Sequence, residues 1–253
     1  MLNVIKSEIY KTRHRVYLFV FLGICCLLGL GAVYLFALSG GGQSRIYYED
    51  ILRLPLAALS FGVYFALIPC DIVFSEEYKH QTMKNTLTFG ISRRSLYFGK
   101  LITSILVALF SAALIIGVFV GSAYLFLGVK DAAAAGEITQ RMLLSLACSL
   151  PLWIGALSVL NMMSFQFRNS TIMSLSYVGL FAILSLLMTL MGYYVSPVFD
   201  FIHDWMIMPQ FDVIKSAASI SGPLILKCTA IGFGYTVGST AIGLLLFRKR
   251  DIK

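Results

Sequence analysis

Charged side chains are scarce in this sequence of 253 residues, and long parts of it contain none. Asp, Glu, Lys and Arg make up 13% of the residues, whereas a soluble globular domain carries about 25%. Hydrophobic residues make up 58% and are spread along the whole chain. Because such a chain cannot cover itself with a polar surface, the composition excludes an ordinary soluble domain and indicates lipid as the solvent.

Six stretches of the sequence contain no charged residue at all. Each supplies roughly the 20 apolar residues that a helix needs to cross the hydrocarbon core, and a charge at mid-helix costs about 2.5 to 3.5 kcal/mol. We therefore predict an all-α integral membrane protein that forms one domain over residues 1–253. The six predicted transmembrane helices lie at about residues 16–38, 54–74, 101–127, 142–166, 170–195 and 225–247. The first is longer than the apolar part of a signal peptide, so we expect it to be retained as a span.

Motifs for catalysis, metal binding and nucleotide binding are missing. The five cysteines show no CxxC spacing, so we expect them to be small buried hydrophobic residues. A metal site from Asp200, His203 and Asp204 is an alternative that no HExxH or comparable pattern supports. The one Gly-Lys pair, Gly99-Lys100, lacks the first glycine and the Ser or Thr of a P-loop. We therefore expect no catalytic residue, no metal and no bound cofactor in this chain.

Basic residues are concentrated on one side of the predicted topology. Fourteen of the twenty Lys and Arg residues lie in the N-terminal segment, the loop 75–100, the connection at Arg168 and the C-terminal tail. The positive-inside rule places these segments, and both termini, in the cytoplasm. The basic residues border the membrane and lack a soluble domain, so we do not expect the chain to bind nucleic acid.

Two segments outside the spans carry apolar residues. Residues 1–15 repeat Leu2, Ile5 and Ile9 at helical spacing among basic residues, which predicts an amphipathic helix along the cytoplasmic membrane surface. The outer loop 196–222 mixes aromatic and aliphatic residues with three aspartates. We predict short interfacial or re-entrant helices there, with Trp205 near the headgroups.

Two GxxxG pairs indicate where helices approach closely. Gly117 and Gly121 lie in the third predicted span, and Gly234 and Gly238 lie in the last. Such spacing lets two backbones come together.

The segment from residue 75 to residue 100 is the most informative part of the sequence. Ser75 is a suitable N-cap before two acidic residues, Gly90 suits a helix C-terminus, and Ser92 is suited to cap the next helix. This pattern predicts a short helix of mixed polarity just outside the bilayer. The residues alone fit equally a docking element for a cytoplasmic partner and an ordinary solvated loop.

This segment resembles the permease signature of the type-2 ABC exporter family. The resemblance covers about a tenth of the chain, and Gln81 stands where the family usually has Gly. The variant E-Y-K-H-x-T-x-K-N-T-L-x-x-G-I-S-R is most similar to permeases linked to bacteriocin or lantibiotic immunity and to bacitracin-type resistance. The residues that carry the resemblance are Glu77, Tyr78, His80, Thr82, Asn85, Thr86, Leu87, Gly90, Ser92, Arg93 and Lys100.

The resemblance implies a transport subunit that works with other proteins. An ABC ATPase subunit would dock on the cytoplasmic loop and carry the ATP and Mg, and a second permease subunit, identical or related, would complete the pathway. Arg93, Arg94 and Lys100 would anchor the loop to anionic headgroups. The expected ATPase-coupling residues are Glu76, Glu77, Tyr78, Lys79, His80, Gln81, Thr82, Asn85 and Leu87.

The expected cargo is an amphipathic or hydrophobic compound, such as an antimicrobial peptide, that is exported across a bacterial plasma membrane. No charged cluster in the spans is available to bind a charged solute. An ATP-independent channel or secondary transporter remains an alternative, although such proteins usually place ionisable residues within their spans. A membrane scaffold that transports nothing is another.

Overall fold

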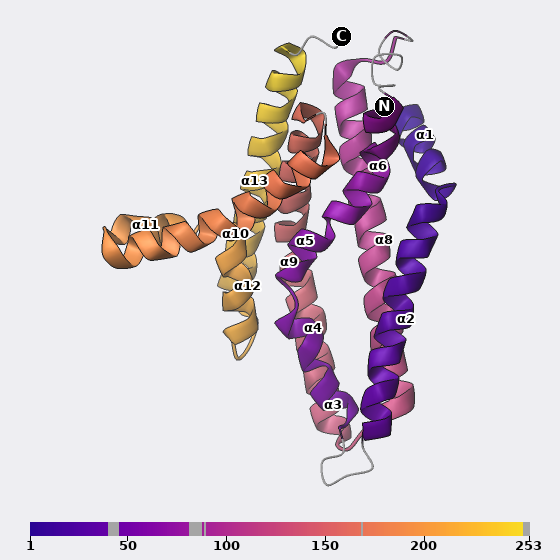
Figure 1. The fold of residues 1–253 in the computed structure, drawn as a ribbon. Helices are drawn as coiled ribbons and strands as arrows, with labels where there is room; N and C mark the ends of the chain where they lie inside the picture. Colours follow the sequence, from indigo (N-terminus) through magenta and orange to yellow (C-terminus); the bar gives the residue numbers. More distant parts are fainter. Residues whose placement is uncertain (40–45, 81–87, 89, 168, 250–253) are drawn as a thin grey trace.

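The computed structural model describes residues 1–39, 46–80, 88, 90–167 and 169–249, with the side chains of residues 76–80 left out of the description. Within these ranges the chain is helical and contains no strand. The elements shown in Figure 1 are α1 (Leu2–Arg13), α2 (Val16–Ser39), α3 (Tyr48–Ile51), α4 (Arg53–Ala57), α5 (Phe61–Phe65), α6 (Leu67–His80), α8 (Arg93–Leu127), α9 (Ala132–Gln166), α10 (Ser170–Tyr194), α11 (Pro197–His203), α12 (Ile207–Ser216) and α13 (Gly222–Lys249).

Five of the described helices are long and apolar enough to cross a membrane, namely α2, α8, α9, α10 and α13. A sixth crossing results when the segments Tyr48–Ala57 and Phe61–Ser75 are taken together, with a bend of 66° between them. The prediction of an all-α membrane protein with about six spans is confirmed.

The second span is broken, whereas the sequence predicts one continuous helix over 54–74. Around Leu59 the backbone hydrogen bonds join residues that are three apart in the sequence instead of four. An example is the bond from Gly62 N–H to the Leu59 carbonyl oxygen, at 3.2 Å. The indole Nε1 of Trp153 in α9 also donates to the Leu59 carbonyl, at 3.1 Å. At the break, the Leu59 carbonyl thus accepts a hydrogen bond from a neighbouring helix in addition to the one from its own segment, which keeps the backbone satisfied as a break at membrane depth requires.

Two long helices begin earlier than the apolar runs that predict them. α8 begins at Arg93, where the Ser92 hydroxyl accepts a hydrogen bond from Ser95 N–H at 3.2 Å. α9 begins at Ala132, where Asp131 caps the Ala133 N–H at 2.9 Å. Side-chain caps, rather than the edge of the apolar run, fix these boundaries.

The central packing contact joins α9 to α13. A Cβ on Gly155 of α9 would lie 2.9 Å from the Gly232 carbonyl oxygen, and a Cβ on Gly232 would collide with the backbone of Pro151. These glycines let the two backbones touch.

The predicted GxxxG pairs do not take part in this contact. Nothing lies within 4 Å of a Cβ built on Gly117, Gly121, Gly234 or Gly238. Within the described chain, the glycines that permit close packing are therefore not those of the sequence motif.

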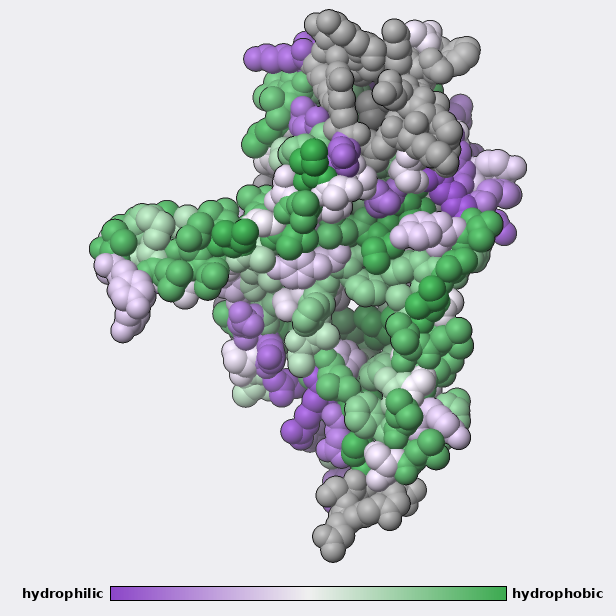
Figure 2. All heavy atoms as spheres, viewed as in Figure 1, coloured by the Kyte–Doolittle hydropathy of each residue, from purple (hydrophilic) through white to green (hydrophobic). Residues whose placement is uncertain are grey.

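The chain places its N-terminal helix and the end of α13 at the same end of the molecule, with α3 at the opposite end (Figure 1). α10 and α11 form an arm that projects sideways from the other helices, and α12 returns the chain to α9 and α13. The segment 196–222 therefore contains two helices. Figure 2 shows hydrophobic side chains covering much of the arm and hydrophilic side chains gathered beside α1.

Candidate coupling site

The described ends of the predicted coupling segment, which are the last turns of α6 and the start of α8, lie at the end of the molecule that holds the N-terminus (Figure 1). The segment is not one long loop, because α6 continues to His80 and α8 begins at Arg93. Ser75 lies inside α6 and does not start a separate helix. The side chains of Glu76, Glu77, Tyr78, Lys79 and His80, and the residues Gln81, Thr82, Asn85 and Leu87, lie outside the described parts, so their coupling role stays a prediction.

The last described turns of α6 are held by the junction between α1 and α2. The guanidinium of Arg15, which lies at that junction, donates hydrogen bonds to the Ile72 carbonyl and to the Ser75 hydroxyl. On the other side of α6, the Ser170 hydroxyl of α10 donates to the Asp71 carboxylate. The helix that leads into the coupling segment is thus bound to two neighbouring parts of the fold.

A buried ion pair joins α1 to α8 and α6. Lys100 of α8 is 0% exposed, and its ammonium donates to Glu8 Oε2 at 2.8 Å and to the Val73 carbonyl of α6 at 3.1 Å. The ammonium also lies 4.8 Å from the centre of the Phe74 ring. A headgroup anchor needs an exposed ammonium, so the role predicted for Lys100 does not fit the structure.

Glu8 remains charged in this buried position. Its carboxylate, 4% exposed, also accepts a hydrogen bond from Lys11 at 2.9 Å. Burial raises the pKa of the Glu8 carboxyl, but the attraction and hydrogen bonds of Lys100 and Lys11 outweigh burial and leave the pKa below its usual value. The stability that this pair adds is therefore present near neutral pH and is lost as the pH falls through the lowered pKa.

Arg93 joins the start of α8 to the end of α13. Its guanidinium donates to the Phe247 carbonyl at 2.5 Å and to the Arg248 carbonyl at 3.1 Å, and it lies 5.5 Å from the centre of the Phe247 ring. The last carbonyls of a helix carry partial negative charge and attract a cation. The headgroup contact predicted for Arg93 is thus replaced by a contact within the protein, whereas Arg94 is exposed.

Comparison with known protein families identifies the chain. Residues 4–181 match the model of a family described as ABC-2 family transporter protein. The chain belongs to this family. It is a permease subunit of an ABC transporter, and the family implies a membrane location and a partnership with an ABC ATPase. No curated protein matches the chain.

Substitution of Arg93 should loosen the end of α13 in this ABC-2 permease. Arg93→Gln removes the charge that binds the Phe247 and Arg248 carbonyls, and we expect a loss of about 1 kcal/mol of unfolding free energy. Hydrogen exchange at the last turn of α13 should become faster. The neighbouring exposed variant Arg94→Gln is the control and should leave exchange unchanged; equal effects of the two variants would contradict the assignment.

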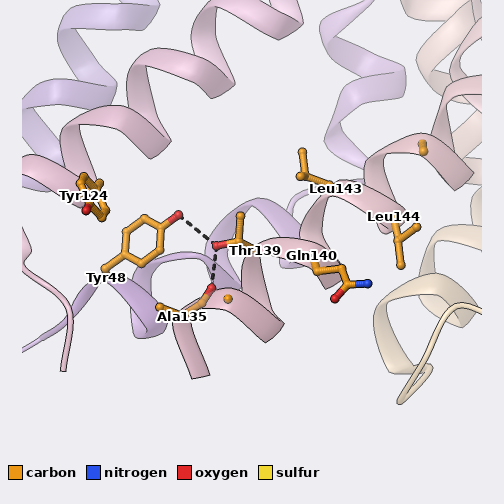
Figure 3. A pocket seen from close by; sticks show the side chains of 9 residues that line it. Tyr48, Tyr124, Ala135, Thr139, Gln140, Leu143 and Leu144 are labelled. Atoms are coloured by element: carbon orange, nitrogen blue, oxygen red, sulfur yellow. Dashed lines mark hydrogen bonds between the residues drawn. The ribbon is translucent and has the colours of Figure 1, made fainter. Parts of the chain in front are cut away.

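A pocket lies beside α3, at the end of the permease away from the N-terminus (Figure 1), and Figure 3 shows the side chains that line it. It has a volume of about 740 Å³ and lies between α3, the end of α8 and the start of α9. The Tyr48 hydroxyl and the Thr139 hydroxyl lie 3.1 Å apart, and Thr139 donates to the Ala135 carbonyl at 2.7 Å. None of the described residues that line this pocket is charged.

The alternative metal site is not assembled. His203 Nε2 lies 3.3 Å from the Ser185 hydroxyl and 3.1 Å from the Thr189 hydroxyl of α10. The Oδ2 atom of Asp204 lies 4.0 Å from the Nζ atom of Lys227. Among the described residues, no group of three or more His, Cys, Asp or Glu side chains is placed to hold a metal ion.

Proposed function

We propose that this ABC-2 permease exports an amphipathic or hydrophobic compound, driven by ATP that a separate subunit hydrolyses. The observation that carries the proposal is that the family match includes residues 75–100, where the sequence has the exporter signature. A further support is that the last turns of α6, at the base of this segment, are held by the α1–α2 junction, by α8 and by α10. A segment with a rigid base can transmit a movement instead of absorbing it.

In the proposed mechanism the ATPase docks on the residues between α6 and α8. Glu77, Tyr78, His80 and Thr82 would lie at the docking surface, and Arg94 would contact anionic headgroups. Closure of the ATPase on ATP would push α6, and the bend of 66° in the second span would let its two halves move relative to each other. A second permease subunit would complete the pathway.

The proposed cargo is an antimicrobial peptide or a similar amphipathic compound. Two pockets of the described chain are lined mainly by apolar and small polar side chains, and neither has a charged residue among its described lining residues. The signature variant supports the bacteriocin-immunity or bacitracin-resistance type. On this proposal the termini face the cytoplasm of a bacterial cell, because most basic residues border that side.

Co-expression with its ABC ATPase in a bacterial host tests this function. Replacing residues 76–90 by a Gly-Ser linker of equal length should abolish both co-purification of the ATPase and ATP-dependent efflux of a fluorescent amphipathic peptide from the cell. The expected reason is that the linker keeps the chain connected but removes the residues that we propose dock the ATPase. Glu137→Gln, which changes an exposed charge at the start of α9, is the control and should export as the original does.

Two results would contradict the proposal. One is a linker variant that still exports at the original rate with ATP. The other is transport by the purified permease alone, driven by an ion gradient without nucleotide, which would favour a secondary transporter.

A further inference from the structure

The broken second span leaves a cavity beside it. The cavity has a volume of about 250 Å³, and its walls come from residues 55–69, from α8 between Ala108 and Ile116, and from α9. Figure 2 shows a hollow among hydrophobic side chains in this part of the molecule. The cavity is therefore enclosed by three candidate membrane spans, which are the broken span, α8 and α9.

Small residues on two facing helices create this space. On the broken span the lining side includes Pro55, Ala58, Gly62 and Ala66, and on α8 it includes Ala112. Such residues project too little to fill the gap between helix axes. The hollow is thus a consequence of the sequence.

Trp153 holds the gap open. Its indole is fixed by the hydrogen bond to the Leu59 carbonyl, at 3.1 Å, and by stacking on Phe211 with ring centres 6.4 Å apart. A Cβ on Gly62 would lie 2.6 Å from Trp153 Cε2, so the two residues are already in close contact. The ring therefore cannot turn into the cavity, and it prevents the broken span from moving closer to α9.

The polar atoms around the cavity already have partners. Ser111 donates to the Val107 carbonyl at 2.7 Å, and Trp153 Nε1 donates to Leu59. A water molecule needs two to four polar partners, and an apolar cavity of about 150 Å³ stays dry and binds benzene. The chemistry of the walls thus selects an apolar occupant.

The cavity reaches the outer surface of the broken span. Phe61 and Phe65, which belong to its lining, are 65% and 42% exposed on the protein surface. The exposed surface of a spanning helix at this depth faces acyl chains. We propose that the cavity binds one hydrocarbon chain of a membrane phospholipid, which fills the space between the broken span and α8. This inference does not depend on the proposed cargo or on export.

Fluorescence of Trp153 tests the proposal directly. The chain has two tryptophans, so Trp205→Phe leaves Trp153 as the single reporter. In nanodiscs made from phospholipid with dibrominated acyl chains, we expect strong quenching of Trp153 relative to unbrominated lipid. Aqueous iodide should quench it little.

Two variants that fill the cavity from opposite walls give the sharper measurement. Ala112→Phe on α8 and Ala66→Leu on the broken span should each lower the quenching by brominated lipid several-fold. Ala113→Phe, on the adjacent exposed position, is the matched control and should leave it unchanged. The proposal is overturned if Trp153 is not quenched in the parent protein, if iodide quenches it as well as lipid does, or if the filled variants are quenched like the control.

Discussion

Lys100→Met should destabilise the protein by about 3 to 5 kcal/mol, because it leaves the buried Glu8 carboxylate without its main partner. The lost contacts are the Glu8 ion pair at 2.8 Å and the hydrogen bond to the Val73 carbonyl at 3.1 Å. Thermal unfolding in detergent should show a large fall in midpoint. Cross-linking between α1 and α8 should also decrease, since the pair fastens α1 to the bundle.

A second substitution separates the charge effect from simple loss of packing. Glu8→Leu combined with Lys100→Met replaces both members of the pair by apolar groups, and such replacement is often neutral. The double variant should therefore recover most of the stability. Lys11 is the other partner of Glu8, and the Lys11 side chain is 50% exposed. Lys11→Met should therefore lower the unfolding free energy only slightly. A double variant no more stable than Lys100→Met would show that the ion pair is not what the lysine contributes.

Gly232→Ala should separate α9 from α13. The added Cβ would collide with the carbonyl group of Pro151 and lie 2.9 Å from Leu152 N, and these backbone atoms cannot turn away as a side chain would. Overpacking of this kind costs about 1 to 3 kcal/mol or more. Unfolding in detergent reports the loss, and a disulfide engineered between α9 and α13 should form more slowly.

Gly234→Ala is a matched control on the same helix. Nothing lies within 4 Å of a Cβ at this position, so we expect stability to stay unchanged or to rise slightly through helix propensity. If Gly234→Ala were the more damaging of the two, the observed packing of α13 on α9 would be wrong.

The spans could be predicted from the sequence because insertion into lipid depends on local composition. Runs without charge identify the apolar helices one by one, and α2, α8, α9, α10 and α13 all contain such a run. The break in the second span could not be found in this way. It is supported by Trp153, nearly a hundred residues away in the sequence, which supplies a second donor for the Leu59 carbonyl.

The charged contacts show a similar limit. Sequence patterns single out Arg93 and Lys100 as notable basic residues, but their position after a loop suggests lipid headgroups, whereas the structure gives them protein partners. Glu8 was missed. One sequence signal was available, because Glu8 is the only acidic residue among the first fifteen. A single acidic residue on an otherwise basic helix is a candidate partner for a buried cation.

Helix packing was the least predictable feature. The GxxxG spacing says that small residues share a helix face, but not which face meets a neighbour. Gly155 and Gly232 belong to neither predicted pair, and they became visible as contact residues only when both helices were placed.

The pairing of α9 with α13 has a consequence for how the chain is made. In the most apolar 18-residue stretch of α9, 61% is buried inside the protein, whereas the corresponding share is 17% to 28% in the other four long helices. Its covered face carries Ser145, Ser149 and Ser158. Translation produces α9 before α13, with α10 to α12 between them. Until α13 is made, the serine-rich face of α9 must therefore stay in the insertion machinery or the bilayer without the helix that finally covers it. A product that ends before Gly222 lacks α13 and is a natural target for membrane quality control.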